Sequence, residues 1–336
     1  EVLSAMRSIV DKFNTAAIYI THDLAVVAQM ADRIKVLRYG EEVEEAETRD
    51  MLSNPKEEYT KSLWSVRSLI KPEETNEDYM LSIKNIDAAY GSSKVLHNVS
   101  IDIPKGKTVA IVGESGSGKS ISALALMGLL PHGSKKEGII NFEGTDLNKI
   151  SEPNFCKLRG KKISMVFQEP MTALNPVQSI GKQISETLVQ HKACAPNELK
   201  NRVRKTMDRV GLRGIDPSRF PHQLSGGQRQ RVVIAMAICL EPSILIADEP
   251  TTALDVTTQS KILKLIQEFA EKDGISIILI THDLAIVANI SNYLLLMKEG
   301  ILVDQGQPKR VFRDLSHPYT KKLFSASSEQ FSFKEK

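Results

Sequence analysis

The amino-acid sequence predicts an α/β fold, and two observations carry that prediction. A glycine-rich loop at 113–120 lies between an apolar run at 108–112, typical of a buried strand, and a segment at 121–127 with an apolar helical face. Beyond this loop, strand and helix patterns alternate to about residue 304. Alternation around such a loop indicates a core in which strands and helices follow one another along the chain.

From residue 80 onward the elements can be assigned in order. Alternating residues at 81–86 predict a half-exposed strand, and 99–103 predicts the strand that leads to the run before the glycine loop. Helical patterns between about 177 and 211 predict a helical insertion near 171–225. The remaining predicted elements are strands at 138–142, 162–167, 243–247, 276–280, 293–297 and 300–304, and helices at 227–240, at 257–272 and directly after His282.

The glycine-rich loop has the pattern G-x-x-x-x-G-K-S. Its residues are Gly113, Glu114, Ser115, Gly116, Ser117, Gly118, Lys119 and Ser120, and the helix continues through Ile121. Glycines let backbone N–H groups converge on phosphate oxygens, and the helix start adds partial positive charge there. We expect Lys119 to reach the β- and γ-phosphates and the Ser120 hydroxyl to ligate Mg²⁺. The alternative is a turn with an incidental lysine, which the flanking strand and helix disfavour.

Composition excludes several classes of protein. Hydrophobic residues make up 41% and charged residues 25%, which is ordinary for a globular protein, and a net charge of +3 does not indicate a nucleic-acid partner. The longest apolar stretch, at 232–240, is too short to span a bilayer. Cys156, Cys194 and Cys239 are dispersed, which fits a reducing cytosol and disfavours zinc or an iron–sulfur cluster.

The sequence contains an internal repeat. Residues 1–65 align without a gap to residues 261–325 at an offset of 260, with 18 identical positions, among them Thr-His-Asp-Leu-Ala at 21–25 and 281–285. A period this long indicates duplicated domains rather than a solenoid. The polar stretch at 66–80 is typical of a linker.

Polar side chains follow several of the predicted strands. Asp248 and Glu249 end an apolar strand, where an open α/β sheet presents its site. Asp248 would hold Mg²⁺ directly or through water, and Glu249 would polarise the water that attacks the γ-phosphate. Gln168 and His282 also follow strands and could lie near Mg²⁺ and the γ-phosphate, although either residue alone could be an ordinary turn or cap.

A second glycine-containing turn opens the predicted helix at 227–240. It consists of Leu224, Ser225, Gly226, Gly227 and Gln228. Free N–H groups and a hydroxyl at a helix start form a candidate anion site, and an N-cap by Ser225 is compatible with that role.

Six motifs therefore occur in a fixed order: GESGSGKS at 113–120, Phe167-Gln168-Glu169-Pro170, LSGGQRQR at 224–231, ILIADEP at 244–250, Thr252-Ala253-Leu254-Asp255, and ITHD at 280–283. This set, over 80–325, resembles an ABC-type ATPase domain. The resemblance implies a P-loop NTPase fold with an antiparallel β subdomain and a helical insertion. It also implies that Tyr90 stacks on adenine, that Gln168 links Mg²⁺ to the transmembrane partner, and that Asp255 contacts the opposite domain. In this family the LSGGQ turn of one domain closes on ATP held by another, in a head-to-tail dimer.

Two further motifs, Met171-Thr172-Ala173-Leu174-Asn175-Pro176 and His317-Pro318-Tyr319-Thr320, are similar to the peptide/nickel importer ATPases, which serve oligopeptide, dipeptide and glutathione systems. Some of those proteins fuse two ATPase domains, and the repeat resembles that arrangement. The first copy keeps His22 but has no glycine loop, LSGGQ turn or Asp-Glu pair. Either it is a fragment of a tandem protein, which the start at Glu1 favours, or it is a structural remnant. The expected divisions are a remnant at 1–70, a linker at 71–79, a complete ABC ATPase domain at 80–325 and a tail at 326–336.

We therefore expect the ATP-hydrolysing subunit of an importer for peptides or related small solutes. The resemblance implies permease subunits and a separate solute-binding protein as partners, and a place at the cytoplasmic face of the membrane. A soluble ABC ATPase acting on DNA or ribosomes is an alternative, but the chain shows no zinc cysteines, heptad arms or long basic linker. An inactive truncated remnant is the other alternative, and ATP turnover would distinguish it.

Overall fold

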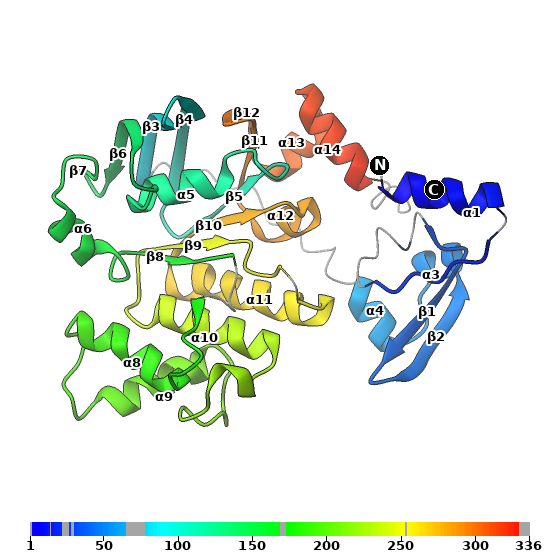
Figure 1. The fold of residues 1–336 in the computed structure, drawn as a ribbon, viewed down its shortest axis with the longest axis horizontal. Helices are drawn as coiled ribbons and strands as arrows, with labels where there is room; N and C mark the ends of the chain where they lie inside the picture. Colours follow the sequence, from blue (N-terminus) through cyan, green and yellow to red (C-terminus); the bar gives the residue numbers. More distant parts are fainter. Residues whose placement is uncertain are drawn as a thin grey trace.

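The computed structural model of this chain describes residues 2–13, 15–21, 27, 30–64, 78–168, 173–252 and 254–328 (Figure 1). Some predictions concern residues outside these ranges: 22–25 in the repeat, 71–77 in the linker, 169–172 in two of the motifs, Ala253, and 329–336 in the tail. None of the helices in the described ranges is long and apolar enough to cross a membrane.

A six-stranded sheet forms the centre of the fold. Its strands lie in the order β12-β11-β5-β10-β9-β8. Their bounds are Thr108–Val112 for β5, Ile163–Val166 for β8, Ile244–Asp248 for β9, Ser276–Thr281 for β10, Tyr293–Lys298 for β11 and Ile301–Gly306 for β12. Neighbours pair in parallel except β11 and β12, which form an antiparallel hairpin. Every residue of β5, β9 and β10 is buried, as expected for parallel strands covered on both faces.

Alternate residues of this sheet belong to two separate hydrophobic cores. Ile244 and Ile246 pack on the side of helix α5, Lys119–Met127, whereas Leu245 and Ala247 pack on the opposite side. The helices of that opposite side are α8, Ile180–Gln190; α9, Leu199–Arg209; α10, Gly226–Ile238; and α11, Val256–Asp273. Figure 1 shows the same layering, with α5 above the sheet and α10 and α11 below it. The predicted helical insertion therefore corresponds to α8 and α9, together with a short 3₁₀ turn at Pro221–Gln223.

A smaller antiparallel sheet, in the order β4-β3-β6-β7, lies on the α5 side. Its strands are β3, Tyr79–Tyr90; β4, Ser93–Pro104; β6, Ser134–Phe142; and β7, Thr145–Asp146. β3, β4 and β6 are longer than the sequence pattern predicted. Each strand contains one residue with an irregular backbone, and the alternation of side chains on which the prediction depends is interrupted there. Asn85 and Asn98 adopt left-handed backbone angles, and Gly138 has φ of +108°, where a Cβ would lie 2.5 Å from the Asn85 carbonyl oxygen. The register shifts there, which interrupts the alternation of side chains.

Several helices were not predicted from the sequence. They include α6, Glu152–Leu158; α13, Pro308–Asp314; and α14, Pro318–Ser328. The predicted short helix after His282 is α12, Leu284–Ile290. Each unpredicted helix is 11 residues or shorter, so its apolar positions cover too few turns to establish a 3.6-residue period.

The N-terminal part of the chain repeats the order of elements seen at its C-terminal end. Helix α1, Val2–Phe13, is followed by β1, Arg33–Arg38; β2, Glu41–Glu47; α3, Thr48–Ser53; and α4, Glu58–Trp64. At an offset of 260, α1 corresponds to the second part of α11, and the other four elements correspond to β11, β12, α13 and α14. Even the irregularity in the hairpin recurs, between Val36 and Leu37 in one copy and between Leu296 and Met297 in the other.

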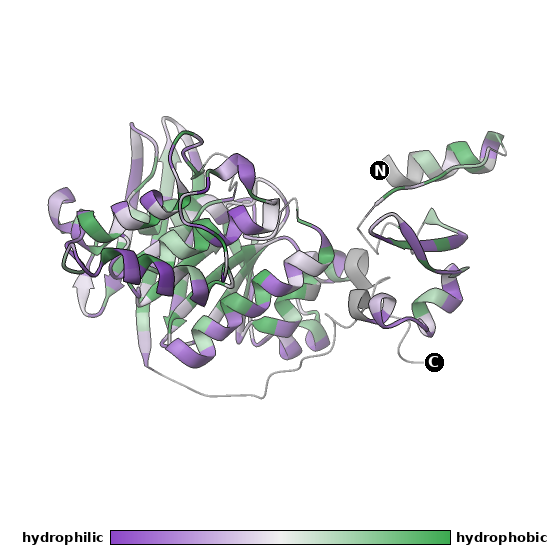
Figure 2. Ribbon diagram, turned by 90° about the horizontal axis from the view of Figure 1, so that it is seen from below, coloured by the Kyte–Doolittle hydropathy of each residue, from purple (hydrophilic) through white to green (hydrophobic). Residues whose placement is uncertain are grey.

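The two copies differ at the segment that should be a central strand. Ile18 and Ile20 are 91% and 97% exposed, whereas their equivalents Ile278 and Ile280 in β10 are 2% and 0% exposed. Helix α1 likewise exposes apolar side chains, including 66% of Phe13, and Figure 2 shows green hydrophobic residues along it. Within the described ranges, the segment 15–21 pairs with no other strand.

Candidate active site

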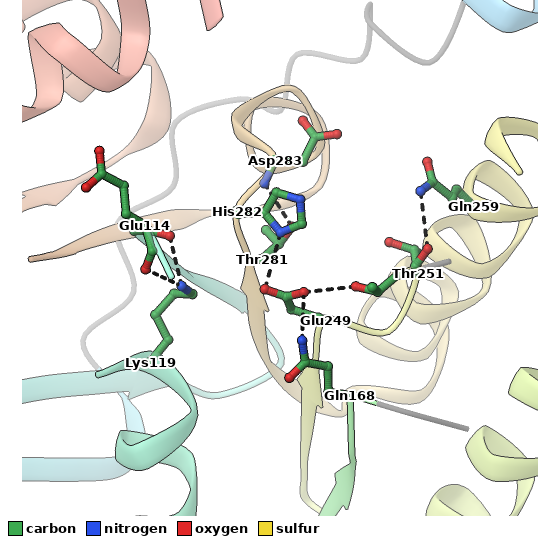
Figure 3. A network of polar contacts seen from close by, with 11 residues as sticks. Glu114, Lys119, Gln168, Glu249, Thr251, Gln259, Thr281, His282 and Asp283 are labelled. Carbon is green, nitrogen blue, oxygen red and sulfur yellow. Dashed lines mark hydrogen bonds and ion pairs between the residues drawn. The ribbon is translucent and has the colours of Figure 1, made fainter. Parts of the chain in front are cut away.

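The carboxyl ends of the parallel strands bring the predicted site residues together. The glycine loop follows β5, Gln168 lies just beyond β8, Glu249 follows β9, and His282 follows β10. Figure 3 shows these residues converging on one edge of the sheet. This edge is where open α/β sheets bind ligands, and the predicted convergence of residues distant in sequence is present.

The glycine loop holds the lysine in a bent conformation. The Lys119 ammonium donates to the carbonyl oxygens of Gly113 at 2.8 Å and Glu114 at 2.9 Å (Figure 3). A Cβ at Gly113 would lie 2.2 Å from the Met297 carbonyl oxygen, and Gly118 has φ of +100°. Both positions therefore require glycine. Burial lowers the pKa of Lys119, and the carboxylates of Glu249 and Asp248 oppose that shift.

The Glu249 carboxylate is held by three side chains at this edge. One carboxylate oxygen, Oε2, accepts from Gln168 Nε2 at 3.2 Å and from Thr252 Oγ1 at 2.9 Å. The other oxygen, Oε1, lies 3.2 Å from His282 Nδ1. The backbone of Glu249 has a positive φ of 44°, which is uncommon for a side chain of this size, and its N–H donates to the Ile280 carbonyl. The sharp turn after β9 therefore directs the carboxylate toward Gln168 and His282.

The protonation of this carboxylate follows from its contacts. Burial would raise the pKa of Glu249, but hydrogen bonds from Thr252 and His282, with the nearby charges of His282 and Lys119, bring the pKa below its ordinary value of 4.5. Glu249 is therefore ionised at neutral pH, the form that can accept a proton from water.

Two polar atoms at the same edge are buried without a partner among the described residues. They are Asp248 Oδ1 and Ser117 Oγ. Burial raises the pKa of Asp248, which a hydrogen bond from Ser120 partly offsets. Buried polar atoms are rarely left unpaired in native structures, so these two atoms indicate that the edge is built for a polar ligand.

The LSGGQ turn forms the predicted N-cap of α10. Ser225 Oγ accepts from the Gln228 N–H at 3.3 Å, and Gln228 Oε1 accepts from the Ser225 N–H at 3.0 Å. A Cβ at Gly227 would lie 2.4 Å from Thr258 Cγ2 in the first turn of α11. That first turn is capped by Asp255, which accepts from the Thr258 N–H at 3.0 Å. Glycine at 227 thus lets the starts of α10 and α11 lie side by side.

Comparisons with known proteins agree with this geometry. The family model described as ABC transporter matches residues 96–252. The dipeptide transport ATP-binding protein DppD of Bacillus subtilis is 45% identical over 257 residues, covering 74% of this chain and 76% of DppD. The oligopeptide transport ATP-binding protein OppD of the same organism is 45% identical over 249 residues, covering 72% and 70%.

The chain belongs to the ABC transporter family of ATP-binding proteins. Among solved structures, it is similar to a dimeric ATP-binding cassette in a post-hydrolysis state bound to ADP and Pi, with a TM-score of 0.61 and 30% identity over 68% of this chain and 99% of that one. It is also similar to cbiO1 from Clostridium perfringens, with a TM-score of 0.64 and 33% identity over 75% and 95% of the two chains. The predicted family, fold and ATPase class are therefore confirmed.

The contacts of Tyr90 in this ABC ATPase do not test its predicted role. Tyr90 is the last residue of β3, is half-buried and pairs with Ser93 and Ser134 in the small sheet. Its stacking on adenine stays a prediction. The remaining predicted roles, those of Ser115, Gly116, Ile121 and Leu224 toward nucleotide included, also stay predictions.

Two residues that contact the site of the ABC ATPase were missed. Thr252 holds Glu249 Oε2, and Tyr319 accepts a hydrogen bond from the Glu114 N–H at 3.0 Å. Thr252 lies three residues beyond Glu249, a spacing that a tight turn after a strand could have indicated. Tyr319 lies 205 residues from Glu114 in sequence, so no local pattern could have connected them.

Proposed function

We propose that this ABC ATPase energises the import of peptides or related small solutes across the cell membrane. The observation that carries the proposal is the ionised Glu249, held by Gln168, Thr252 and His282 at the strand edge that also carries the glycine loop. Support for peptides comes from relatives named for dipeptide and oligopeptide transport. The chain would sit on the cytoplasmic face, bound to permease subunits, while a separate solute-binding protein selects the substrate.

The residues at the edge fit a nucleotide with a divalent cation. The glycine loop would bind the phosphates of ATP, and the third N–H of the Lys119 ammonium, which the Gly113 and Glu114 carbonyls do not use, would reach them. Ser120, Gln168 and Asp248 would hold Mg²⁺, because a hydroxyl, an amide and a carboxylate are the oxygen donors that this ion prefers. The unpaired Asp248 Oδ1 supports that assignment. The bound ion would neutralise charge on the phosphate oxygens.

Four residues of the chain would have different roles in ATP hydrolysis. Glu249 would accept a proton from the attacking water, since its pKa lies below the ordinary value and it is charged at neutral pH. Gln168 and His282 flank the two carboxylate oxygens and would orient that water and the γ-phosphate. Thr252 would keep Glu249 in position.

We further propose that two ATPase domains pair head to tail to complete each site. The central sheet lies between α5, which follows the glycine loop, and α10, which Ser225 caps. Ser225 and Lys119 of one domain thus belong to opposite layers, and a second domain would supply the LSGGQ turn. Asp255, beside that turn, would contact the opposite domain.

For domain organisation, we propose that 1–70 corresponds to the C-terminal part of another ABC ATPase domain, 71–79 to a linker and 80–325 to the complete domain, with a tail at 326–336. Two features support this division. The hairpin irregularity between Val36 and Leu37 recurs 260 residues later. Arg38 also lies 4.7 Å from the ring centroid of Tyr59, as Lys298 lies 5.6 Å from that of Tyr319.

Peptide import is tested in the organism that encodes the chain. Glu249→Gln, introduced at the chromosomal locus, should abolish uptake of a labelled dipeptide or oligopeptide while leaving uptake of a free amino acid unchanged. The matched control is Glu268→Gln on the surface of α11, where the carboxylate pairs with Lys272 at 3.1 Å, one turn along the same helix. Undiminished peptide uptake in the Glu249→Gln strain would sink the proposal.

Head-to-tail pairing has its own test. Lys119→Ala and Ser225→Arg chains should each be inactive as homodimers, because every site lacks one component. Mixing them should restore part of the activity, since a mixed dimer pairs one intact loop with one intact turn. A monomeric preparation that hydrolyses ATP at undiminished specific activity on dilution would contradict this arrangement.

A further inference from the structure

Helix α14 reaches the glycine loop through a single tyrosine. The Tyr319 side chain is 5% exposed, and its Oη accepts from the backbone N–H of Glu114 at 3.0 Å. Three residues along the same helix, Lys322 Nζ lies 3.7 Å from Glu114 Oε1. The helix therefore contacts the second residue of the loop through both its backbone and its side chain.

The peptide that Tyr319 holds is the one that positions the catalytic lysine. The N–H of Glu114 and the carbonyl of Gly113 belong to the same planar peptide unit. Its carbonyl oxygen accepts from Lys119 Nζ at 2.8 Å, while its N–H donates to Tyr319. Because the unit is planar, turning the N–H away from Tyr319 also turns the carbonyl away from Lys119.

Tyr319 is itself held firmly. Its backbone N–H donates to His317 Nδ1 at 3.1 Å, and the next residue, Thr320, donates from Oγ1 to Asp304 Oδ2 at 2.6 Å. The Lys298 ammonium lies 5.6 Å from the centroid of the tyrosine ring. These contacts anchor the start of α14 to β11 and β12, so the hydroxyl is presented from a rigid base.

We propose that Tyr319 is a positioning residue of the ATP site: its hydroxyl fixes the Gly113–Glu114 peptide and thereby sets where Lys119 meets the phosphates. The inference deepens the proposed function and rests on it, because it assigns α14 to the same ATP site. Tyr319→Phe keeps the ring and its packing but removes the acceptor, leaving a partly buried N–H unpaired.

The repeat supplies a matched control. Tyr59 occupies the equivalent position, its ring lies near Arg38 as that of Tyr319 lies near Lys298, and it packs on the cluster of Ile34, Val36 and Met51. The glycine-loop motif occurs once in the sequence, at 113–120, outside this copy. Tyr59→Phe therefore makes the same chemical change away from the loop.

The experiment measures ATP affinity by equilibrium titration of the full chain and its variants, with thermal melting of each. Tyr319→Phe should weaken ATP binding by about three- to tenfold, the effect of losing one hydrogen bond that orients a loop. Tyr59→Phe should leave ATP affinity unchanged. In a Lys119→Ala background, adding Tyr319→Phe should cause little further loss, because the tyrosine acts through that lysine.

The outcomes separate the two proposals. An unmodified chain that fails to bind ATP overturns the proposed function together with this inference. If the unmodified chain binds ATP and Tyr319→Phe binds equally well, only the positioning role is refuted. An equal loss in the presence and absence of Lys119 also refutes it, since the tyrosine would then act by another route.

Discussion

Replacing Glu249 with glutamine removes the charge of the candidate base and keeps the shape of its side chain. Glutamine can turn its amide oxygen toward the donors of Gln168 and Thr252, which lie 3.2 Å and 2.9 Å from the present Oε2. Its NH₂ group then faces His282 Nδ1, which accepts when the ring proton sits on Nε2. The side chain therefore keeps its position, while the proton acceptor for water is lost.

The expected fall in turnover is therefore the effect of losing the proton acceptor alone. Loss of a general base lowers turnover by about 10² to 10⁴-fold, equivalent to roughly 2.7–5.4 kcal/mol of transition-state stabilisation. ATP affinity should stay within about threefold, because Glu249 does not belong to the phosphate-binding loop. Phosphate release at saturating ATP measures the first quantity and nucleotide titration the second.

Glu268→Gln makes the same chemical change at an exposed position of α11 and should change neither quantity. Turnover by Glu249→Gln within about twofold of the unmodified chain, with ATP binding intact, would show that the base lies elsewhere. An equal fall in both variants would point to a general effect of the substitution.

Three further changes test other parts of the site. Lys119→Ala should weaken ATP binding by about 1.5–3 kcal/mol through loss of a charge-assisted contact, and equal dissociation constants in a titration would refute the loop assignment. Gly227→Val should destabilise the fold by about 1–3 kcal/mol in denaturant unfolding, because a Cβ there lies 2.4 Å from Thr258 Cγ2; an unchanged midpoint would contradict the close approach. The pKa of Glu249 lies below its ordinary 4.5, so its charge stabilises the fold above that pH and this contribution disappears as pH falls through the folded-state pKa. The melting difference between the unmodified chain and Glu249→Gln should therefore shrink on acidification, and a growing difference would oppose the assigned sign.

Much of the site could be predicted because its parts are locally encoded. Gly118 needs glycine because of its own φ of +100°, and Ser225 caps its helix using Gln228 only three residues away. Gly113 differs, because the atom that a Cβ there would meet is the carbonyl oxygen of Met297, far along the chain. Convergence of Gln168, Glu249 and His282 followed from the rule that parallel strands end at one edge. The ends of the antiparallel strands were not predictable in the same way, since Asn85 and Gly138 interrupt the alternation on which strand boundaries depend.

Contacts between residues far apart in the chain could not be predicted from the sequence. The motif containing Tyr319 was recognised as a resemblance, yet nothing in its residues indicates a hydrogen bond to Glu114. The position of Tyr319 depends on the β11–β12 hairpin, on the anchor between Thr320 and Asp304, and on the loop that follows β5. Each of these parts can be predicted separately, but the contact between them forms only in the assembled fold.

The repeat shows why local sequence does not by itself decide burial. Residues 15–21 and 275–281 are equivalent positions, and both copies place isoleucines at the same two sites. In β10, Ile278 and Ile280 are buried because β5 and β9 flank the strand and helices cover it. Ile18 and Ile20 have no such neighbours among the described residues and stay almost fully exposed. The hairpin and helices that follow form in both copies because their contacts are nearby in sequence, whereas a central parallel strand depends on partners supplied from elsewhere.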